Sequence, residues 1–267
     1  MLLFANARLI TAVRIMQYLA KQPEIRSLLF VVNGDQIASE DVLSYFQNGR
    51  IPVSVVRHNN IGSEFGGYQR AADVLTSAGA KKVLILNDTV GSHQFVDAHY
   101  LRDFVRCFAA DKSGIVFVGR VVQSSDIISL GNFSSKSWVQ SHIFGIDKGA
   151  LGLIDNKIYY PEVSDLIRDS TSVEDFFHPE IGSYLKAHLT HWLFGFGEGT
   201  WYNARPLTSE SVHLLANRAR AILQEMSLSM RLEKKQSIIL NMDVFQRRDI
   251  PTRARCWIWS KSGYLFL

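Results

Sequence analysis

The stretch of sequence best suited to bind a ligand is a glycine-rich turn at residues 57–71, RHNNIGSEFGGYQRA. It follows an apolar run, IPVSVV, that predicts a strand, and it leads into a segment with helical spacing. Glycine lets a backbone approach a ligand closely, and the start of a helix offers unpaired N–H groups to an anion. Arg57 could hold a phosphate or a carboxylate through two hydrogen bonds, or it could form an ordinary ion pair with Asp35 or Glu64.

Two further predicted strands also end in polar residues. The run LLFVV leads into Asn33 and Asp35, and the run KVLIL leads into Asn87 and Asp88. Ligands collect beyond the carboxyl ends of parallel strands, so these residues join the turn as binding candidates. Asp88 could hold a divalent metal at such a sheet edge; the alternative is a helix cap or a turn residue.

The order of apolar and amphipathic segments predicts an α/β fold with a mostly parallel sheet flanked by helices. The serine-rich residues 123–137 are predicted to form a loop, and helices are predicted at 178–189 and 209–235. We expect one domain, residues 1–210, with a helical, basic and aromatic extension, residues 211–267, packed on the same body. The predicted strands are residues 28–32, 51–56, 82–86 and 114–119, with a shorter one at 1–5.

The net charge of +4 is concentrated at one end of the chain. From Arg218 onward, ten Lys or Arg face four Asp or Glu, which gives +6 and leaves −2 for the first 217 residues. Such a segment fits an anionic partner or the solvated face of a helix. Its last residues mix aromatics with arginines, as in Trp257 and Arg255, which suits a bilayer interface or stacking on bases. We expect contact with the membrane surface and no nucleic acid.

The cysteines and the hydropathy pattern predict a location. Cys107 and Cys256 lie far apart in no metal-ligand spacing and give no disulfide framework, which suits a reducing compartment. No apolar stretch approaches the roughly 20 residues needed to cross a bilayer. We expect a cytoplasmic protein that is peripheral at the inner face of the cell membrane.

Other acid and base candidates carry weaker signals. His142 and Asp147 flank the run IFGI and could face a cleft, but a polar residue at a strand edge needs no function. Glu180 follows Pro179 in the first turn of a predicted helix, where the helix dipole favours a carboxylate without any catalysis. No GxxxxGK motif occurs, and no GxGxxG follows the first strand, which argues against nucleotide hydrolysis and dinucleotide-dependent oxidoreduction. Three histidines match no usual zinc-ligand spacing: His178, His188 and His191.

Taken in order, VVRHNNIGSEFGGYQRA, KKVLILNDTVGS and SHIFGIDKGAL resemble motifs of the bacterial polysaccharide glycosyltransferases related to the rhamnan synthesis protein F family. The resemblance covers roughly residues 25–190, and its first two motifs are specific together though weak singly. It implies a GT-A-like fold, in which a Rossmann-like half binds a sugar nucleotide and a second half shapes the acceptor side. It also implies transfer of a sugar from a nucleoside-diphosphate sugar to a saccharide or lipid-linked acceptor, with inversion at the anomeric carbon, in cell-surface polysaccharide synthesis.

The resemblance also implies roles for particular residues. Arg57, Asn60 and Gly62 would lie near the nucleotide, and the adjoining helix would start at Gly66. The Asn87–Asp88–Thr89 turn would take the place of the metal- and diphosphate-binding motif, with Mn or Mg on Asp88.

Glu180 would be the base that deprotonates the acceptor hydroxyl. A single carboxylate follows the KVLIL strand, which leaves two alternatives open. The chain is either a transferase or a non-catalytic protein of the same fold that binds a glycan or a partner enzyme. A third, weaker idea is a nucleic-acid-binding protein that uses the basic tail.

Overall fold

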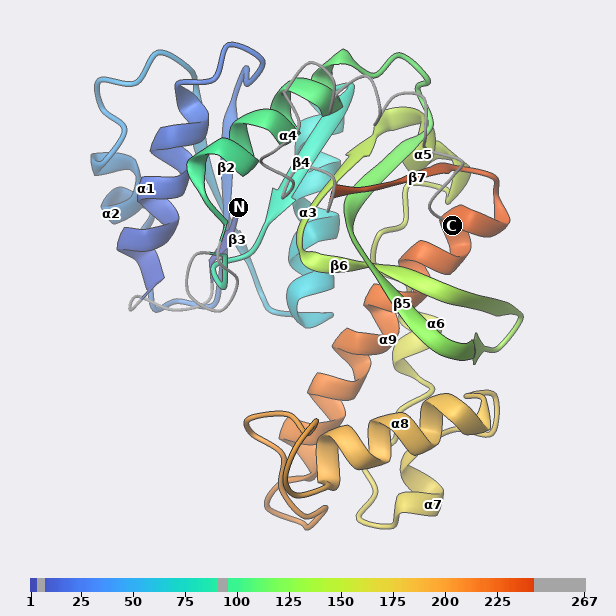
Figure 1. The fold of residues 1–267 in the computed structure, drawn as a ribbon. Helices are drawn as coiled ribbons and strands as arrows, with labels where there is room; N and C mark the ends of the chain where they lie inside the picture. Colours follow the sequence, from blue (N-terminus) through green and yellow to red (C-terminus); the bar gives the residue numbers. More distant parts are fainter. Residues whose placement is uncertain (4–7, 91–95, 243–267) are drawn as a thin grey trace.

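The computed structural model describes residues 1–3, 8–90 and 96–242 of the 267-residue chain (Figure 1). These residues form an α/β body with two sheets and a helical part packed below them (Figure 1). The α/β class predicted from the sequence is confirmed, and the arrangement of the strands differs in part from the expectation.

The first sheet is parallel throughout and carries the polar strand ends. All six residues of β2 are buried, as expected for a parallel strand that is covered on both faces. The crossover helices are α1 (Leu9–Ala20) and α2 (Ser39–Ser44). In the order β1-β2-β3, the strands are β1 (Leu2–Leu3), β2 (Leu28–Asn33) and β3 (Val53–His58).

The second sheet is mixed, so the expectation of a mostly parallel sheet is wrong for this half. Strand β6 runs antiparallel to both of its neighbours, whereas β7 is parallel to β5. Helices α3 (Ser63–Ser77), α4 (Ala98–Ala110) and α5 (Lys148–Leu153) belong to this part of the chain. In the order β4-β6-β5-β7, the strands are β4 (Lys82–Leu86), β6 (Phe133–Asp147), β5 (Val116–Leu130) and β7 (Ile238–Asn241).

The loop predicted at residues 123–137 is instead the outer part of a long β5–β6 hairpin. Its turn is at Gly131, whose φ of +54° lies in the left-handed region. Ser135, Ser137 and Val139 are buried while the residues between them are more exposed, which is the period of two expected for a strand. The prediction failed because the serine-rich composition hid this alternation.

The helical part lies below the second sheet (Figure 1). The predicted helix at 178–189 begins only at Ser183, so Glu180 lies in a turn before it. The predicted long helix is α9, which packs against the helical part through Leu215 and Leu223 and against the sheets through Leu228. Residues 243–267, with the basic and aromatic tail, lie outside the described residues. The helices are α6 (Pro161–Ser164), α7 (Val173–Phe176), α8 (Ser183–Phe194) and α9 (Val212–Lys234).

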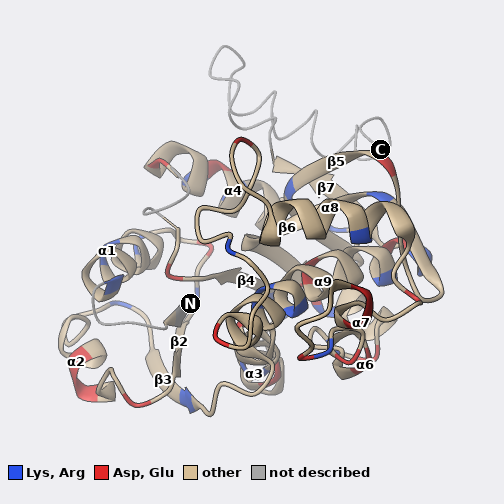
Figure 2. Cartoon of the chain, turned by 90° about the horizontal axis from the view of Figure 1, so that it is seen from below, with Lys and Arg blue, Asp and Glu red and all other residues tan. Residues whose placement is uncertain are grey.

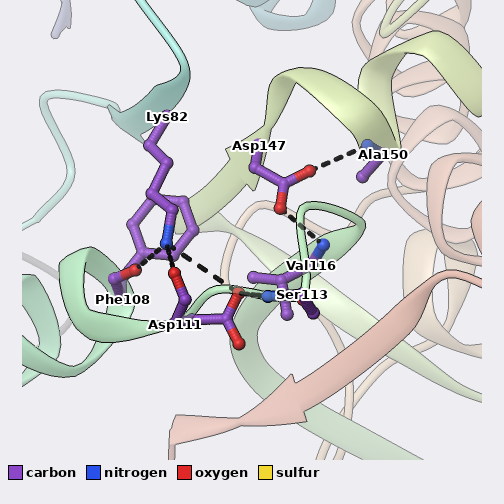
Figure 3. A network of polar contacts seen from close by, with 7 residues as sticks. All are labelled: Lys82, Phe108, Asp111, Ser113, Val116, Asp147 and Ala150. Atoms are coloured by element: carbon purple, nitrogen blue, oxygen red, sulfur yellow. Dashed lines mark hydrogen bonds and ion pairs between the residues drawn. The ribbon is translucent and has the colours of Figure 1, made fainter.

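A polar network stabilises the sheet edge opposite the polar strand ends (Figure 3). The ammonium of Lys82 donates to the carbonyls of Phe108 and Asp111, the latter at 2.6 Å, and so caps the end of α4. Burial lowers the pKa of Lys82, and the charge of Asp111 opposes that shift. Asp147, a candidate acid or base, accepts from Val116 N at 2.9 Å and Ala150 N at 2.8 Å, so its role is to cap α5.

Two further expectations concern cysteine and membranes. Cys107 is buried in α4 and is disulfide-bonded, so the expectation of isolated thiols is wrong for it, and Cys256 lies outside the described residues. Across residues 1–3, 8–90 and 96–242, no helix is both long enough and apolar enough to span a bilayer.

Candidate functional site

The carboxyl ends of β2, β3 and β4 converge around the first turn of α3. The side chains of Asn33 and His58 lie 2.8 Å apart, and the Asn33 amide lies 3.5 Å from the Ser63 carbonyl. In the same turn, Glu64 accepts a hydrogen bond from the Asn87 amide. Figure 2 views this side of the molecule, with α3 nearly end-on, β2 and β3 on one side and α7 and α9 on the other. The three polar clusters predicted from the sequence are therefore neighbours.

The glycines of the turn are required by the conformation and close packing of the backbone. A Cβ on Gly66 would lie 1.8 Å from the Ile61 carbonyl, so only glycine lets α3 start this close to the turn. Gly62 has a φ of +72°, and a Cβ there would lie 2.8 Å from the Tyr159 ring. Asn60 is exposed with a φ of +62°. These positions shape the turn, in which the N–H groups of Asn60, Ile61 and Ser63 donate to neighbouring acceptors.

Arg57 lies in a cleft of about 650 Å³ at the ends of β2 and β3. Its guanidinium donates to the Gly34 carbonyl at 3.1 Å and the Ile37 carbonyl at 3.2 Å, and it lies 3.4 Å from the Asp35 carboxylate. The ion pair with Asp35, one of the two roles predicted for Arg57, is therefore present. The Asp35 carboxylate is fully exposed, so the pair is weak. Arg57 is therefore available to an anion in the cleft, which is lined by Gly34, Asp35, Arg57, His58, Asn59 and Arg70.

Asp88 is buried at the end of β4 and forms an ion pair with Arg8 at 3.2 Å. Within residues 1–3, 8–90 and 96–242, no three His, Cys, Asp or Glu side chains are grouped to hold a metal. Magnesium often binds through only one or two protein carboxylates, with water and substrate phosphates completing its coordination. Asp88 could supply one such carboxylate, but its side chain has no exposed surface and is paired with Arg8, so a metal would fit there only by displacing Arg8.

No local pattern in the sequence indicates the contribution that α9 makes to this site. Burial raises the pKa of Glu64 to about 7; the charge of Arg218 opposes the shift, and the charge of Glu225 adds to it. Arg218 and Glu225 both belong to α9, about 150 residues further along the chain. A long amphipathic pattern predicts a helix, but it does not say which sheet edge that helix meets.

Glu225 is itself held firmly in place. Its carboxylate accepts hydrogen bonds from Trp138 Nε1 at 2.9 Å and from Ser141 N at 2.7 Å and Oγ at 2.6 Å. Burial raises the pKa of Glu225, and the hydrogen bonds from Ser141 oppose that shift. Tyr68, in the second turn of α3, donates to the Ser141 carbonyl at 3.0 Å. This network fixes α3, β6 and α9 to one another behind the strand ends.

His142 lies beside the strand ends, and its carbonyl accepts from Asn87 N at 3.1 Å. Burial and the nearby charge of Arg120 lower the pKa of His142 to about 4. The imidazole is therefore neutral near pH 7 and does not add to the positive charge of the site.

Glu180 does not join the other candidates. Its carbonyl accepts from Gly131 N at 3.0 Å, at the turn of the β5–β6 hairpin, and its side chain is exposed. Leu86, at the end of β4, pairs with Ile143, and the hairpin extends ten residues beyond that pair to Phe133. At about 3.3 Å per residue, Glu180 lies roughly 30 Å along the hairpin from the strand ends.

A second cavity of about 560 Å³ lies between β2 and β4, toward the amino ends of these strands. Its walls are mostly aliphatic, including Leu28, Leu84 and Leu75. Such a lining offers few partners to a sugar or a diphosphate, so this cavity is distinct from the candidate site.

The candidate site thus joins the ends of three strands, the first turn of α3 and residues of α9. Compared with known proteins, the sequence matches no family model and no curated protein.

Proposed function

We propose that this protein is a GT-A-like glycosyltransferase that moves a sugar from a nucleoside-diphosphate sugar to a saccharide or lipid-linked acceptor in cell-surface polysaccharide synthesis. The observation that carries the proposal is the meeting of three strand ends at the first turn of α3, where the charges of Asp88 and Arg218 act on Glu64, beside the cleft that Arg57 lines. Cations, an acidic residue and the start of a helix in this region suit a diphosphate and a reacting hydroxyl.

The division of the fold supports the same proposal. The strands of the parallel sheet β1-β2-β3 end at the polar cleft. The mixed sheet and helices α6 to α9 form the other part of the molecule. A nucleotide-binding half next to a half that shapes the acceptor side is the arrangement that the sequence resemblance implies. The likeness in arrangement is the basis for calling the fold GT-A-like.

The donor would lie with its diphosphate between Arg57 and Asp88. Departure of the nucleoside diphosphate builds negative charge on its phosphate oxygens, and preformed cations and N–H dipoles stabilise that charge. A divalent metal bound at Asp88 would supply further positive charge. Arg8, paired with Asp88, places a second guanidinium at the same strand end.

The base that deprotonates the acceptor is better assigned to Glu64 than to Glu180. Glu64 lies at the strand ends, and a pKa of about 7 suits a base that works near neutral pH. Glu180 lies on the far hairpin turn. In this assignment, the Asn87 amide orients the Glu64 carboxylate, and the Arg218 charge keeps part of it ionised.

The alternative is a non-catalytic protein of the same fold that binds a glycan or a partner enzyme. The Arg8–Asp88 ion pair favours it, because a guanidinium lies where the transferase would bring a metal. The two functions differ in turnover, since only the transferase releases nucleoside diphosphate from a donor.

The decisive experiment incubates the full chain with UDP-, dTDP- and GDP-sugars, with and without Mn²⁺, and measures release of the nucleoside diphosphate. The transferase predicts release from one donor class and a loss of at least 100-fold in Asp88→Ala. Binding of the same donors without release would favour the non-catalytic alternative.

The cytoplasmic, membrane-peripheral location remains part of this proposal. The segment expected to touch the membrane lies outside the described residues, and the disulfide of Cys107 removes the argument from free thiols. Separating the cell membrane from the soluble fraction, with and without a high-salt wash, would test it.

A further inference from the structure

We propose that Arg218, Trp192 and Trp201 form the acceptor subsite of this protein, which binds one ring of a neutral saccharide. The inference rests on the proposed function, because it names the residues that would hold the acceptor. It depends on separate observations in the helical part of the molecule.

The loop after α8 is a built structure that presents aromatic rings. Trp201 N donates to the Trp192 carbonyl at 2.9 Å, which folds the loop back onto the end of α8. A Cβ on Gly195 would lie 2.3 Å from the His191 carbonyl, so the chain leaves α8 in a way that requires glycine. Gly197 has a φ of +96°, which makes the next turn a glycine position as well. The backbone that carries these aromatic residues is therefore constrained.

The aromatic rings form a continuous group. Trp192 and Trp201 stack with their centroids 5.9 Å apart at 22°, and Tyr202 meets Trp201 edge-on at 5.6 Å. Phe196 and Tyr202 are 77% and 75% exposed, the two highest values among the large hydrophobic residues of the described chain. A cluster of exposed aromatics on a fixed loop is typical of a binding surface rather than of a core.

Arg218 lies against this group with one buried donor unsatisfied. Its guanidinium carbon is 5.5 Å from the Trp192 ring centroid and 5.8 Å from that of Trp201. Its Nε is buried, and in the part of the chain that the structure describes it has no hydrogen-bond partner. A guanidinium carries five N–H donors in a fixed plane, and buried donors are nearly always satisfied. An acceptor oxygen of a ligand would satisfy Nε.

The subsite lies on the same side of the molecule as the proposed chemistry. Burial raises the pKa values of Glu64 and Glu225, and the charge of Arg218 opposes both shifts, so its guanidinium is within electrostatic reach of the strand ends. In Figure 1 the first turn of α3 points toward the helical part that contains this loop. Glu180 is at the other end of α8, which is about 18 Å long.

These groups select a neutral saccharide. A pyranose presents an apolar C–H face that packs on an indole ring, and hydroxyl oxygens that accept hydrogen bonds from a guanidinium. An anionic ligand would meet the carboxylates of Glu64 and Glu225 nearby. The saccharide could be free or could be carried on a lipid, since both sources present the same ring.

The test measures saccharide binding by saturation-transfer NMR on the full chain, with and without UDP. The probes are maltose and the methyl glycosides of glucose, galactose and rhamnose. The expected result is binding of at least one probe, with affinity at least tenfold weaker in Arg218→Met and in Trp192→Ala. Both variants should keep the far-UV circular dichroism spectrum of the wild type and a cooperative melting transition, which confirms that they fold. Arg168→Met, an exposed arginine in the same part of the molecule, serves as the control and binds like the wild type.

The outcomes separate this inference from the proposed function. A wild type that binds UDP and none of the saccharides overturns the subsite, as does full saccharide affinity in Arg218→Met. A wild type that binds saccharide through Arg218 but no nucleotide keeps the subsite and overturns the transferase. Comparing octyl β-glucoside below its micellar concentration with methyl β-glucoside identifies the source, because tighter binding of the octyl form indicates a lipid-linked acceptor.

Discussion

The guanidinium of Arg8 lies 3.2 Å from the carboxylate of Asp88, although the two residues are 80 positions apart in the chain. The Asp88 side chain has no exposed surface, whereas that of Arg8 is 34% exposed. The pair joins the start of α1 to the end of β4. A change to either residue of this pair should therefore alter both the stability of the fold and the net charge of the candidate site.

Removing this partner should destabilise the protein. Breaking a buried ion pair leaves an uncompensated charge and costs about 3–5 kcal/mol. Because Arg8 is partly exposed and Asp88 has further contacts, we expect the lower part of that range for Arg8→Met. Urea denaturation measures the loss. Arg14→Met, on the exposed side of α1, is the matched control and should change stability little. Equal effects of the two variants would contradict this role for the ion pair.

Gly66→Ala should damage the turn that holds the site. The added methyl would lie 1.8 Å from the Ile61 carbonyl, so backbone has to move and nucleotide binding should weaken along with stability. Gly152→Ala is the control, since Gly152 is also helical and nothing lies within 4 Å of its added Cβ. There alanine should be neutral or stabilising, by up to about 1 kcal/mol. Thermal denaturation of both variants, with and without UDP, checks the prediction; equal melting temperatures would refute it.

Glu64→Gln should stabilise the protein at high pH only. The folded protein binds the Glu64 proton more tightly than the unfolded chain, because its pKa rises from 4.5 to about 7. The contribution of this group is therefore complete below about pH 4.5 and is lost as the pH rises through 7. Glutamine does not ionise, so its contribution does not change with pH. The free energy of unfolding of the variant should therefore exceed that of the wild type by up to about 3 kcal/mol at pH 8 and should equal it at pH 4.5.

Urea denaturation at these two pH values measures the gain. Glu162→Gln, at an exposed position, should show no such dependence on pH. A gain of the same size at both pH values in Glu64→Gln would mean that desolvation does not control the Glu64 carboxyl.

Glu64→Gln and Glu180→Gln should separate the two candidate bases. Loss of a general base costs about 10²- to 10⁴-fold in turnover, and we expect that loss in Glu64→Gln with donor affinity retained. Glu180→Gln should keep wild-type turnover because the side chain lies at the hairpin turn. Steady-state release of nucleoside diphosphate measures both. Loss of turnover in Glu180→Gln, with wild-type turnover in Glu64→Gln, would identify Glu180 as the base instead of Glu64.

The sequence predicted the strand ends well because local patterns determine them. Apolar runs locate β2, β3 and β4 to within a few residues, and the polar residues that follow each run meet at the first turn of α3. The turn at 57–71 also starts a helix as predicted. The carboxyl ends of neighbouring parallel strands must meet, which is enough to bring the ends of β2 and β3 together. The position of β4, in the second sheet, was not determined by that rule.

The remainder of the site depends on contacts that no local pattern contains. The β5–β6 hairpin was not predicted because its serine-rich sequence is typical of a loop. The turn of this hairpin lies far from the strand ends and contacts Glu180, so Glu180 is far from them too. The position of Arg218 depends on how α9 crosses the molecule. Its amphipathic period predicts the helix but not the sheet edge that it meets.

The most direct test of the central claim is a calorimetric titration of the full chain with UDP and dTDP, in the presence and absence of Mn²⁺. If the three strand ends form a nucleotide site, one diphosphate should bind to the wild type, at least tenfold more weakly to Asp88→Ala and to Arg57→Met, and equally well to the exposed control Asp165→Ala. Absence of binding to the wild type, or the same affinity in Asp88→Ala and Arg57→Met as in the wild type, would contradict it.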